Sequence, residues 1–361
     1  MRREVAKTTV VTALAMLASM AFALPAQAGH VSCGQVITED TTLDADVGPC
    51  PANGLIVEAD GVKLDLNGHT VFGTPDVGDG AGILVRGSRG VKVTNGTVTQ
   101  FDGGVVIEGG GANSVTGIVA RDNIGHSEGH PPAPGTRYGE GIAVEGSSDN
   151  RIADNVVVNN GPFAGIGLYE RPDTDHPFPA APVERNAVMN NVVEDNQFCR
   201  VNRLTGARFC DNIGIRLEPG VGPGNAVMSN EIRRNGLDGL SLFADADDNA
   251  VMRNLVEGNG FWGAVPGDGI RVFGSRNQIH QNRSFANRAG GISVGRRTGF
   301  PLGTLPRNAT TGNPRGQFND IIRNQTGQNL IFDLWDGNPN CDQNTWRRNT
   351  FQTANQPCTT L

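Results

Sequence analysis

Residues 225–242 read NAVMSNEIRRNGLDGLSL, and this stretch decides the fold. Asn225, Asn230 and Asn235 stand five residues apart, and the first two are each followed, two positions later, by an apolar residue. An alternating run, Gly239-Leu240-Ser241-Leu242, comes next. Apolar residues that alternate with polar ones between tight turns predict short strands separated by corners. One such unit is too short to bury its own apolar face, so neighbouring units must complete the core.

Both signals recur along the chain. The Asn triplets are Asn150, Asn155, Asn160; Asn186, Asn191, Asn196; Asn225, Asn230, Asn235; Asn249, Asn254, Asn259; Asn277, Asn282, Asn287; and Asn319, Asn324, Asn329. The runs that start with Gly begin at Gly54, Gly82, Gly104, Gly141, Gly165, Gly214, Gly239, Gly269 and Gly291. Because Asn tolerates a left-handed backbone, we expect it at the corners, with its amide bonded to the Asn of the next coil as a ladder.

Repeated units of short strands and corners predict an all-β fold. We expect a right-handed parallel β-helix of about ten coils with an Asn ladder and disulfide-tied ends. The repeat resembles the secreted right-handed parallel β-helix family, the pectin-lyase-like superfold, from Gly54 to Phe351. We expect a signal peptide at 1–28, an N-terminal cap region at 29–53, the β-helix at 54–340, and a C-terminal coil and cap at 341–361. The superfold implies no single function, because it hosts lyases, hydrolases, epimerases, adhesins and proteins without catalytic activity.

The first 28 residues have the pattern of an export signal. Arg2, Arg3 and Lys7 precede an apolar run at 10–24, and Ala26-Gln27-Ala28 has the small residues of a cleavage site. The run is shorter than the roughly 20 residues that span a bilayer. We therefore expect cleavage after Ala28, export to the periplasm, the cell surface or the medium, and no membrane span in the mature chain.

The charge balance excludes one class of partner. The formal net charge is −7, and removal of residues 1–28 takes away three cations and Glu4. The remaining chain carries −9 and has no basic tract, which argues against a nucleic-acid partner. The rod needs no partner to be complete, so we expect a monomer.

Six Cys residues in an exported chain favour three disulfides. Connectivity is formally one of about 15. The cysteines nevertheless fall in local pairs, which predicts Cys33 with Cys50, Cys199 with Cys210, and Cys341 with Cys358.

Four insertions interrupt the coils, at 124–139, 170–182, 197–210 and 296–317. Long loops on a rigid scaffold often carry binding and catalytic residues. The first three insertions flank the strands at Gly141, Gly165 and Gly214. We expect them to wall a trough whose floor is the outer face of the Gly-Ile sheet.

Strand alternation predicts which side chains form this floor. The catalytic candidates are Glu145, Tyr169 and Glu218, and the substrate-binding candidates are Arg216, Arg271, Phe243 and Phe273. A carboxylate or a Tyr can transfer a proton, Arg can hold a uronate carboxylate, and aromatic faces stack on sugar rings. The row suits a linear polysaccharide or cell-surface glycan. The alternative is a solvated outer face that binds nothing.

The reaction itself stays open. The sequence lacks the Arg-x-Pro-x-x-Arg motif of pectate lyases and the Gly-His-Gly and Arg-Ile-Lys motifs of polygalacturonases, so no known active site carries over. The resemblance implies a lyase, a hydrolase or an epimerase if the protein is an enzyme. A non-catalytic surface or adhesion module is the alternative.

A weaker alternative is metal handling in the periplasm. Met189, Met228 and Met252 occupy one repeat position in three successive coils, and His280 occupies it in the fourth. Thioether and imidazole ligands suit Cu(I), and the resemblance to exported β-helix proteins, some of which are involved in copper-enzyme maturation, makes this alternative worth naming. A hydrophobic ladder on the Asn-side sheet explains the Met residues without any metal.

Calcium is the only cofactor that we keep open. Asp238 and Asp268 precede Gly239 and Gly269 at equivalent repeat positions. Carboxylates stacked in this way can bind Ca²⁺, although Asp-Gly is also an ordinary turn signal.

Overall fold

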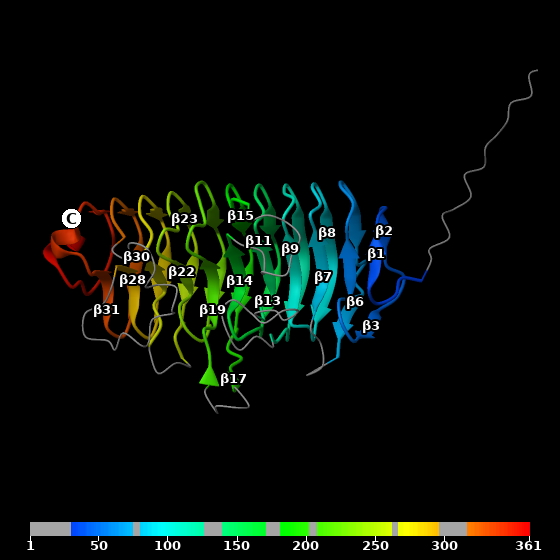
Figure 1. The fold of residues 1–361 in the computed structure, drawn as a ribbon. Coiled ribbons are helices and arrows are strands. Elements are labelled where there is room, and N and C mark those ends of the chain that lie inside the picture. The colour runs from blue at the N-terminus through cyan, green and yellow to red at the C-terminus, as the bar shows by residue number, and fades with distance from the viewer. Residues whose placement is uncertain are drawn as a thin grey trace, which may run out of the picture.

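The computed structural model describes residues 30–74, 80–125, 139–170, 181–201, 208–261, 266–295 and 316–361. The chain forms a rod of stacked coils that runs in chain order from β1 (Gln35–Ile37) at one end to β31 (Phe332–Asp336) at the other (Figure 1). The expected signal peptide lies outside the described residues. Within the described ranges, no helix has the length and apolar character needed to cross a membrane.

One side of the rod is a sheet of eleven parallel strands, which we call the first sheet. Its strands are, in spatial order, β1, β4 (Leu55–Val57), β7 (Ala81–Arg86), β9 (Gly103–Glu108), β11 (Ile142–Glu145), β14 (Ala164–Tyr169), β19 (Ile213–Leu217), β22 (Leu240–Leu242), β25 (Ile270–Val272), β28 (Gly290–Val294) and β31. Each strand pairs with the next along the axis, so every coil contributes one strand. The predicted parallel β-helix is confirmed.

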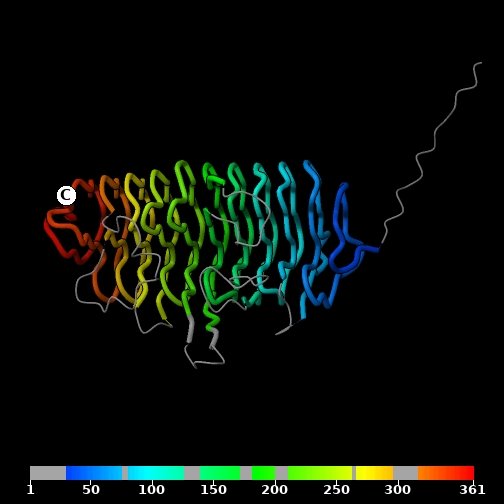
Figure 2. Tube along the Cα trace, in the orientation of Figure 1, coloured from blue at the N-terminus to red at the C-terminus, as the bar shows by residue number. Residues whose placement is uncertain are grey.

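The other side of the rod consists of two rows of short strands joined by corners. The trace in Figure 2 follows the successive coils along the rod. One row holds β2 (Thr41–Thr42), β5 (Lys63–Asp65), β12 (Arg151–Ala153), β15 (Ala187–Met189), β20 (Ala226–Met228), β23 (Ala250–Met252), β26 (Gln278–His280), β29 (Asp320–Ile322) and β32 (Thr345–Arg347). The other row holds β3 (Val47–Cys50), β6 (Thr70–Gly73), β13 (Val156–Val158), β16 (Val192–Glu194), β21 (Glu231–Arg233), β24 (Leu255–Glu257), β27 (Arg283–Phe285) and β30 (Gln325–Gly327). β8 (Lys92–Thr99) and β10 (Ser114–Arg121) belong to both rows.

Few elements depart from this pattern. A short antiparallel hairpin, β17 (Arg200–Val201) with β18 (Arg208–Phe209), stands at the third insertion. Two 3₁₀ turns, η3 (Pro339–Cys341) and η4 (Pro357–Thr360), lie at the C-terminal end.

The coils extend further than the repeat signals indicate at the N-terminal end. β1 pairs in parallel with β4, with Gln35 opposite Leu55. The segment expected to be a cap region, 29–53, therefore already contributes strands to a first coil. At the other end Asn344 and Asn349 continue the ladder, as the spacing predicted.

Columns of apolar residues fill the interior. One column is Ile142, Ile166, Ile215, Leu240 and Ile270, in register on successive strands of the first sheet, and all five are fully buried. Each such side chain stabilises the fold by about 1.5–3 kcal/mol relative to full exposure. A single coil cannot reach this burial, because its partners in the column come from its neighbours.

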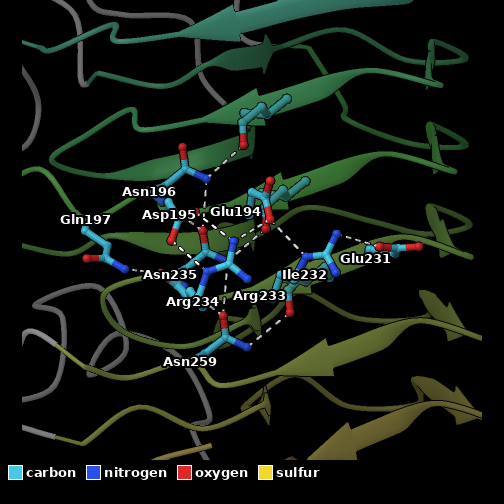
Figure 3. Close-up of polar contacts among 12 residues, drawn as sticks. Glu194, Asp195, Asn196, Gln197, Glu231, Ile232, Arg233, Arg234, Asn235 and Asn259 are labelled. Atoms are coloured by element: carbon cyan, nitrogen blue, oxygen red, sulfur yellow. Dashed lines mark hydrogen bonds and ion pairs between the residues drawn. The ribbon is translucent and has the colours of Figure 1, made fainter.

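The Asn residues form three ladders along the rod. Asn235, for example, accepts a bond from the Nδ2 of Asn196 at 2.9 Å through its Oδ1 and donates to the Oδ1 of Asn259 at 3.1 Å (Figure 3). Its Nδ2 also donates to the carbonyl of Val193. The predicted ladder is confirmed, and it extends to Asn113, which the triplet pattern missed.

The prediction that Asn itself adopts the left-handed conformation is wrong. Positive φ values occur at the residue before the ladder Asn, for example Asn190 (56°), Ser229 (56°) and Arg253 (56°). The ladder Asn needs its side chain turned inward to reach the next coil. The preceding residue therefore makes the bend, whatever its side chain.

The three predicted disulfides are confirmed. Cys33 bonds to Cys50, Cys199 to Cys210, and Cys341 to Cys358. The first and last close loops at the two ends of the rod.

Candidate functional site

The outward positions of the first sheet change character along the rod. Early strands place Ile56, Leu84, Val106 and Ala143 in register at the central outward position. In later strands this position holds Arg216, Ser241, Arg271 and Ser293. The backbone geometry is the same throughout, so the sequence alone converts an apolar face into a charged one.

Arg216 is 1% exposed and is held by two carboxylates. Its Nε donates to Oε1 of Glu218 and its Nη1 to Oδ2 of Asp211. The guanidinium lies 4.5 Å from the ring centre of Phe243 and 5.3 Å from that of Phe163. Burial alone would lower the pKa of Arg216, but the charges of Glu218 and Asp211 outweigh it and raise the pKa, so the side chain stays cationic.

Arg271 has an equivalent environment further along the rod. Its Nε donates to Oδ2 of Asp268 at 2.8 Å, and its Nη2 lies 3.2 Å from Oδ1 of Asp238. Ser241 donates to Asp238 at 2.7 Å, and Ser293 donates to Asp268 at 3.0 Å. The result is a connected network of charged and hydroxyl groups across three strands.

Tyr169 joins the Arg216 group on its other side. Its hydroxyl donates to Oε1 of Glu140 at 2.5 Å, and it is 4% exposed. Burial, followed by the negative charge of Glu140, raises the pKa of Tyr169 well above its usual value, while Arg216 opposes the shift. The phenol therefore keeps its proton at neutral pH and is a proton donor rather than a base.

Glu145 lies beside Tyr169. The two residues are in register on β11 and β14, and Glu108 follows on β9. Glu145 is 2% exposed and Glu108 is fully buried. Carboxylates and a protonated phenol thus lie on adjacent strands, an arrangement that can move a proton between them.

The sequence predicted the orientation of these residues correctly and their exposure incorrectly. The pairing register shows that Glu145, Arg216 and Arg271 lie on the outer face, as strand alternation requires. The alternative interpretation, a solvated outer face, is wrong, because all seven candidate residues, including Phe243 and Phe273, are buried. Among the described residues, ion pairs and ring contacts join Arg216 to Glu218 and Phe243, and a ring contact joins Arg271 to Phe273.

Some members of the network were missed by the sequence reasoning. Glu140, Asp211 and Phe163 complete the groups around Tyr169 and Arg216. Glu140 stands immediately before Gly141, as Asp238 does before Gly239. An acid before the repeat Gly was thus the available signal for Glu140.

The carboxylates named for calcium are bonded to protein groups. Asp238 and Asp268 contact Arg271, and the backbone N–H of Gly290 donates to Asp268 at 2.7 Å. Across the described ranges, no group of three or more His, Cys, Asp or Glu residues is arranged to hold a metal ion. Calcium at this pair stays a prediction.

The Met row lies on the other side of the rod. Met189, Met228, Met252 and His280 are in register on β15, β20, β23 and β26. These side chains are half-buried and point outward, whereas the intervening Val and Ile residues fill the core. Within the described chain, Nε2 of His280 is buried without a hydrogen-bond partner. Desolvation lowers the pKa of His280, so its imidazole is neutral at pH 7.

The structure describes part of each insertion. Residues 126–138, 171–180, 202–207 and 296–315 lie outside the described residues, and with them the greater part of the expected trough walls.

Comparison with solved structures identifies the same fold elsewhere. The chain is similar to the Dettilon tailspike protein, with 15% identity, a TM-score of 0.52, and coverage of 86% of this chain and 53% of the tailspike. It is also similar to the periplasmic alginate epimerase AlgG, with 15% identity, a TM-score of 0.52, and coverage of 88% and 73%. The chain thus spans about half the length of the tailspike protein. At this identity the likeness shows the fold alone.

Comparison of the sequence gives one family. No curated protein matches the chain significantly. Residues 62–282, more than half of the chain, match the family described as "Periplasmic copper-binding protein (NosD)". The repeat coils and the outward Met row lie largely within this match, and the chain belongs to the NosD family of parallel β-helix proteins.

Proposed function

We propose that the outer face of the first sheet binds an extracellular polysaccharide and processes it by proton transfer. The observation that carries this proposal is the change from apolar to charged residues at equivalent outward positions, from Ala143 to Arg216 and Arg271. Three disulfides fit an exported protein, in the periplasm or outside the cell.

The fold does not require these charges. Burying an ion pair costs desolvation energy that its attraction often fails to recover. Leu84 and Val106 occupy the same outward position at no such cost. Buried ionisable groups with strongly perturbed pKa values, such as Tyr169, are typical of functional sites.

The residues divide into two roles. In this proposal a uronate carboxylate displaces an acidic partner of Arg216 or Arg271, and its neutralisation acidifies the adjacent C–H bond. Glu145 accepts that proton and Tyr169 donates one, because the two lie in register and Tyr169 is protonated. This set serves β-elimination or epimerisation, whereas Glu145 and Glu218 as a pair serve hydrolysis.

Phe243 and Phe273 have a different role from the one their residue type suggested. Their rings lie against the guanidiniums of Arg216 and Arg271, at 4.5 and 5.9 Å. We assign them to positioning the two Arg side chains rather than to stacking on sugar rings.

The test is incubation of the mature protein with uronate-containing and neutral polysaccharides, with and without calcium. Absorbance at 235 nm reports elimination, new reducing ends report hydrolysis, and proton NMR reports epimerisation. We expect Glu145→Gln and Tyr169→Phe to lower the rate by about 10²–10⁴-fold, the usual contribution of a positioned acid or base. Glu58→Gln is the matched control, since Glu58 follows Val57 as Glu145 follows Val144 in the same sheet.

If none of the three assays detects a reaction, but the protein binds glycan and Arg216→Gln and Arg271→Gln abolish that binding, the protein is a non-catalytic surface or adhesion module rather than an enzyme. If no reaction and no glycan binding is detected, the polysaccharide proposal is excluded.

The Met row supports a second candidate function, the binding of Cu(I). Three thioethers and one imidazole lie in register about 4.8 Å apart per coil. This donor set fits a soft monovalent ion, and Nε2 of His280 has no hydrogen-bond partner among the described residues. The description of the NosD family points to the same metal.

Competition with a Cu(I) chelator tests this candidate. We expect Met228→Leu with Met252→Leu to weaken Cu(I) binding by at least about tenfold, because Leu keeps the volume and removes the sulfur. His280→Gln should weaken it as well, and His69→Gln, in an early coil, serves as the control. Equal affinity in wild type and the Met variant would exclude the row as the copper site.

A further inference from the structure

A pocket of about 480 Å³ opens where the Met row ends. Met252, His280 and Ile322 form its floor, on β23, β26 and β29. Gln281, Arg323 and Arg348, at the corners of the last three coils, form its walls together with Arg347 in β32, which is in register with Ile322. The pocket lies on the side of the rod away from the first sheet, so it is separate from the Arg216 network.

Three Arg side chains in this pocket have no acidic partner among the described residues. Arg323, Arg347 and Arg348 are exposed. The backbone N–H of Arg323 donates to the carbonyl of Arg347, and that of Arg348 donates to the carbonyl of Leu361. Asp320, on β29 of the same sheet, has a carboxylate close enough to act on His280, although it does not line the pocket. The residues that line the pocket include three guanidiniums and no carboxylate.

Two corner Arg residues elsewhere in the rod are neutralised. Arg234 bonds to Asp195 at 2.8 Å and to Glu194 at 2.6 Å (Figure 3). Arg276 bonds to Asp248 at 2.8 Å and to Asp247 at 3.0 Å. In both cases the acid stands in the corner of the preceding coil.

The corresponding acid is missing beside the pocket. The corner row that contains Arg323 and Arg348 reads Asn190, Ser229, Arg253, Gln281, Arg323, Arg348 in successive coils. Adjacent coils are about 4.8 Å apart. Like charges at this spacing repel, and an anion between them removes the repulsion.

We propose that this pocket binds a small ligand that carries two or more oxyanion groups, either phosphates or carboxylates. The planar guanidiniums of Arg323 and Arg348 can each donate two hydrogen bonds to an oxyanion, the bidentate geometry typical of Arg. Gln281 adds an amide donor, and Met252 and Ile322 provide an apolar floor for the carbon skeleton. Binding here requires neither polysaccharide processing nor copper.

Calorimetry and thermal unfolding at low salt test the proposal. The probes are pyrophosphate for phosphates, and citrate and a trigalacturonate for carboxylates. We expect at least one probe to bind and to raise the melting temperature, with an affinity that falls as salt rises. Tight binding of pyrophosphate alone assigns the pocket to phosphates, and binding of citrate or the trimer assigns it to carboxylates.

The variants locate the site. We expect Arg323→Gln with Arg348→Gln to weaken binding by at least about tenfold, because two charge-assisted contacts are lost. Arg276→Gln is the matched control, since it removes a corner Arg that is already neutralised. If the double variant loses stability, the single Arg347→Gln variant carries the test. The proposal is overturned if no probe binds, or if the Arg variants bind as tightly as wild type and Arg276→Gln.

Discussion

Tyr169 gives the residue-scale test of the buried network. Its folded-state pKa is raised above the usual value of about 10, by burial and by Glu140. Stability from this group is therefore fully present below pH 10 and is lost as pH rises toward the folded pKa, because the unfolded chain ionises first. Urea unfolding from pH 8 to 11 should show a larger loss for wild type than for Tyr169→Phe. Parallel curves for the two proteins would contradict the raised pKa.

For single residues, the sequence predicted which face of the sheet a side chain lies on, but not which groups surround it. Alternation placed Glu145 and Arg216 on the outer face, because side chains of a strand alternate whatever the tertiary structure. Their burial depends on groups such as Asp211 and Phe163, which reach Arg216 from the turn before β19 and the segment before β14. No local pattern in the sequence connects these segments.

The Asn ladder is the element whose contribution can be measured most directly. Asn230 donates to Val188 and Asn254 and accepts two bonds from Asn191, all inside the rod. We expect Asn230→Ala to lower the free energy of unfolding by about 3 kcal/mol, since several buried polar groups lose their partners. Asn349, at the half-buried end of the same ladder, is the matched control, and Asn349→Ala should cost less. Equal losses in chemical denaturation would show that burial of the ladder is irrelevant.

The elements were predictable where the repeat is regular. The Asn spacing defined the corners and the Gly runs defined the first sheet. β1 was missed, because the first coil lacks both signals although Val36 and Ile37 pair with the next strand. The long strands β8 and β10 pass through a corner that the triplet pattern does not mark, with Gly117 at positive φ in the second.

For the whole molecule, the free energy of unfolding is approximately the sum of the stability of each coil and of the interfaces between neighbouring coils. The Cys341–Cys358 bond closes a loop with a sequence separation of 17 at the C-terminal end. We expect Cys341→Ser with Cys358→Ser to lose about 3 kcal/mol locally. Hydrogen exchange should quicken in β31 and β32 and stay unchanged in β14. Uniformly faster exchange along the rod would indicate one cooperative unit instead.

The coil, the ladder and the disulfide pairs could be predicted from the sequence, because each depends on spacing within one or two repeats. Cys33 and Cys50, for example, need only the closure of one local loop. Only the tertiary structure decided which charges are neutralised. Arg276 pairs with Asp248 of the preceding coil, whereas the corner positions on either side of Arg323 hold Gln281 and Arg348. That difference arises from stacking, which brings together corners that are 24 to 42 residues apart in the chain.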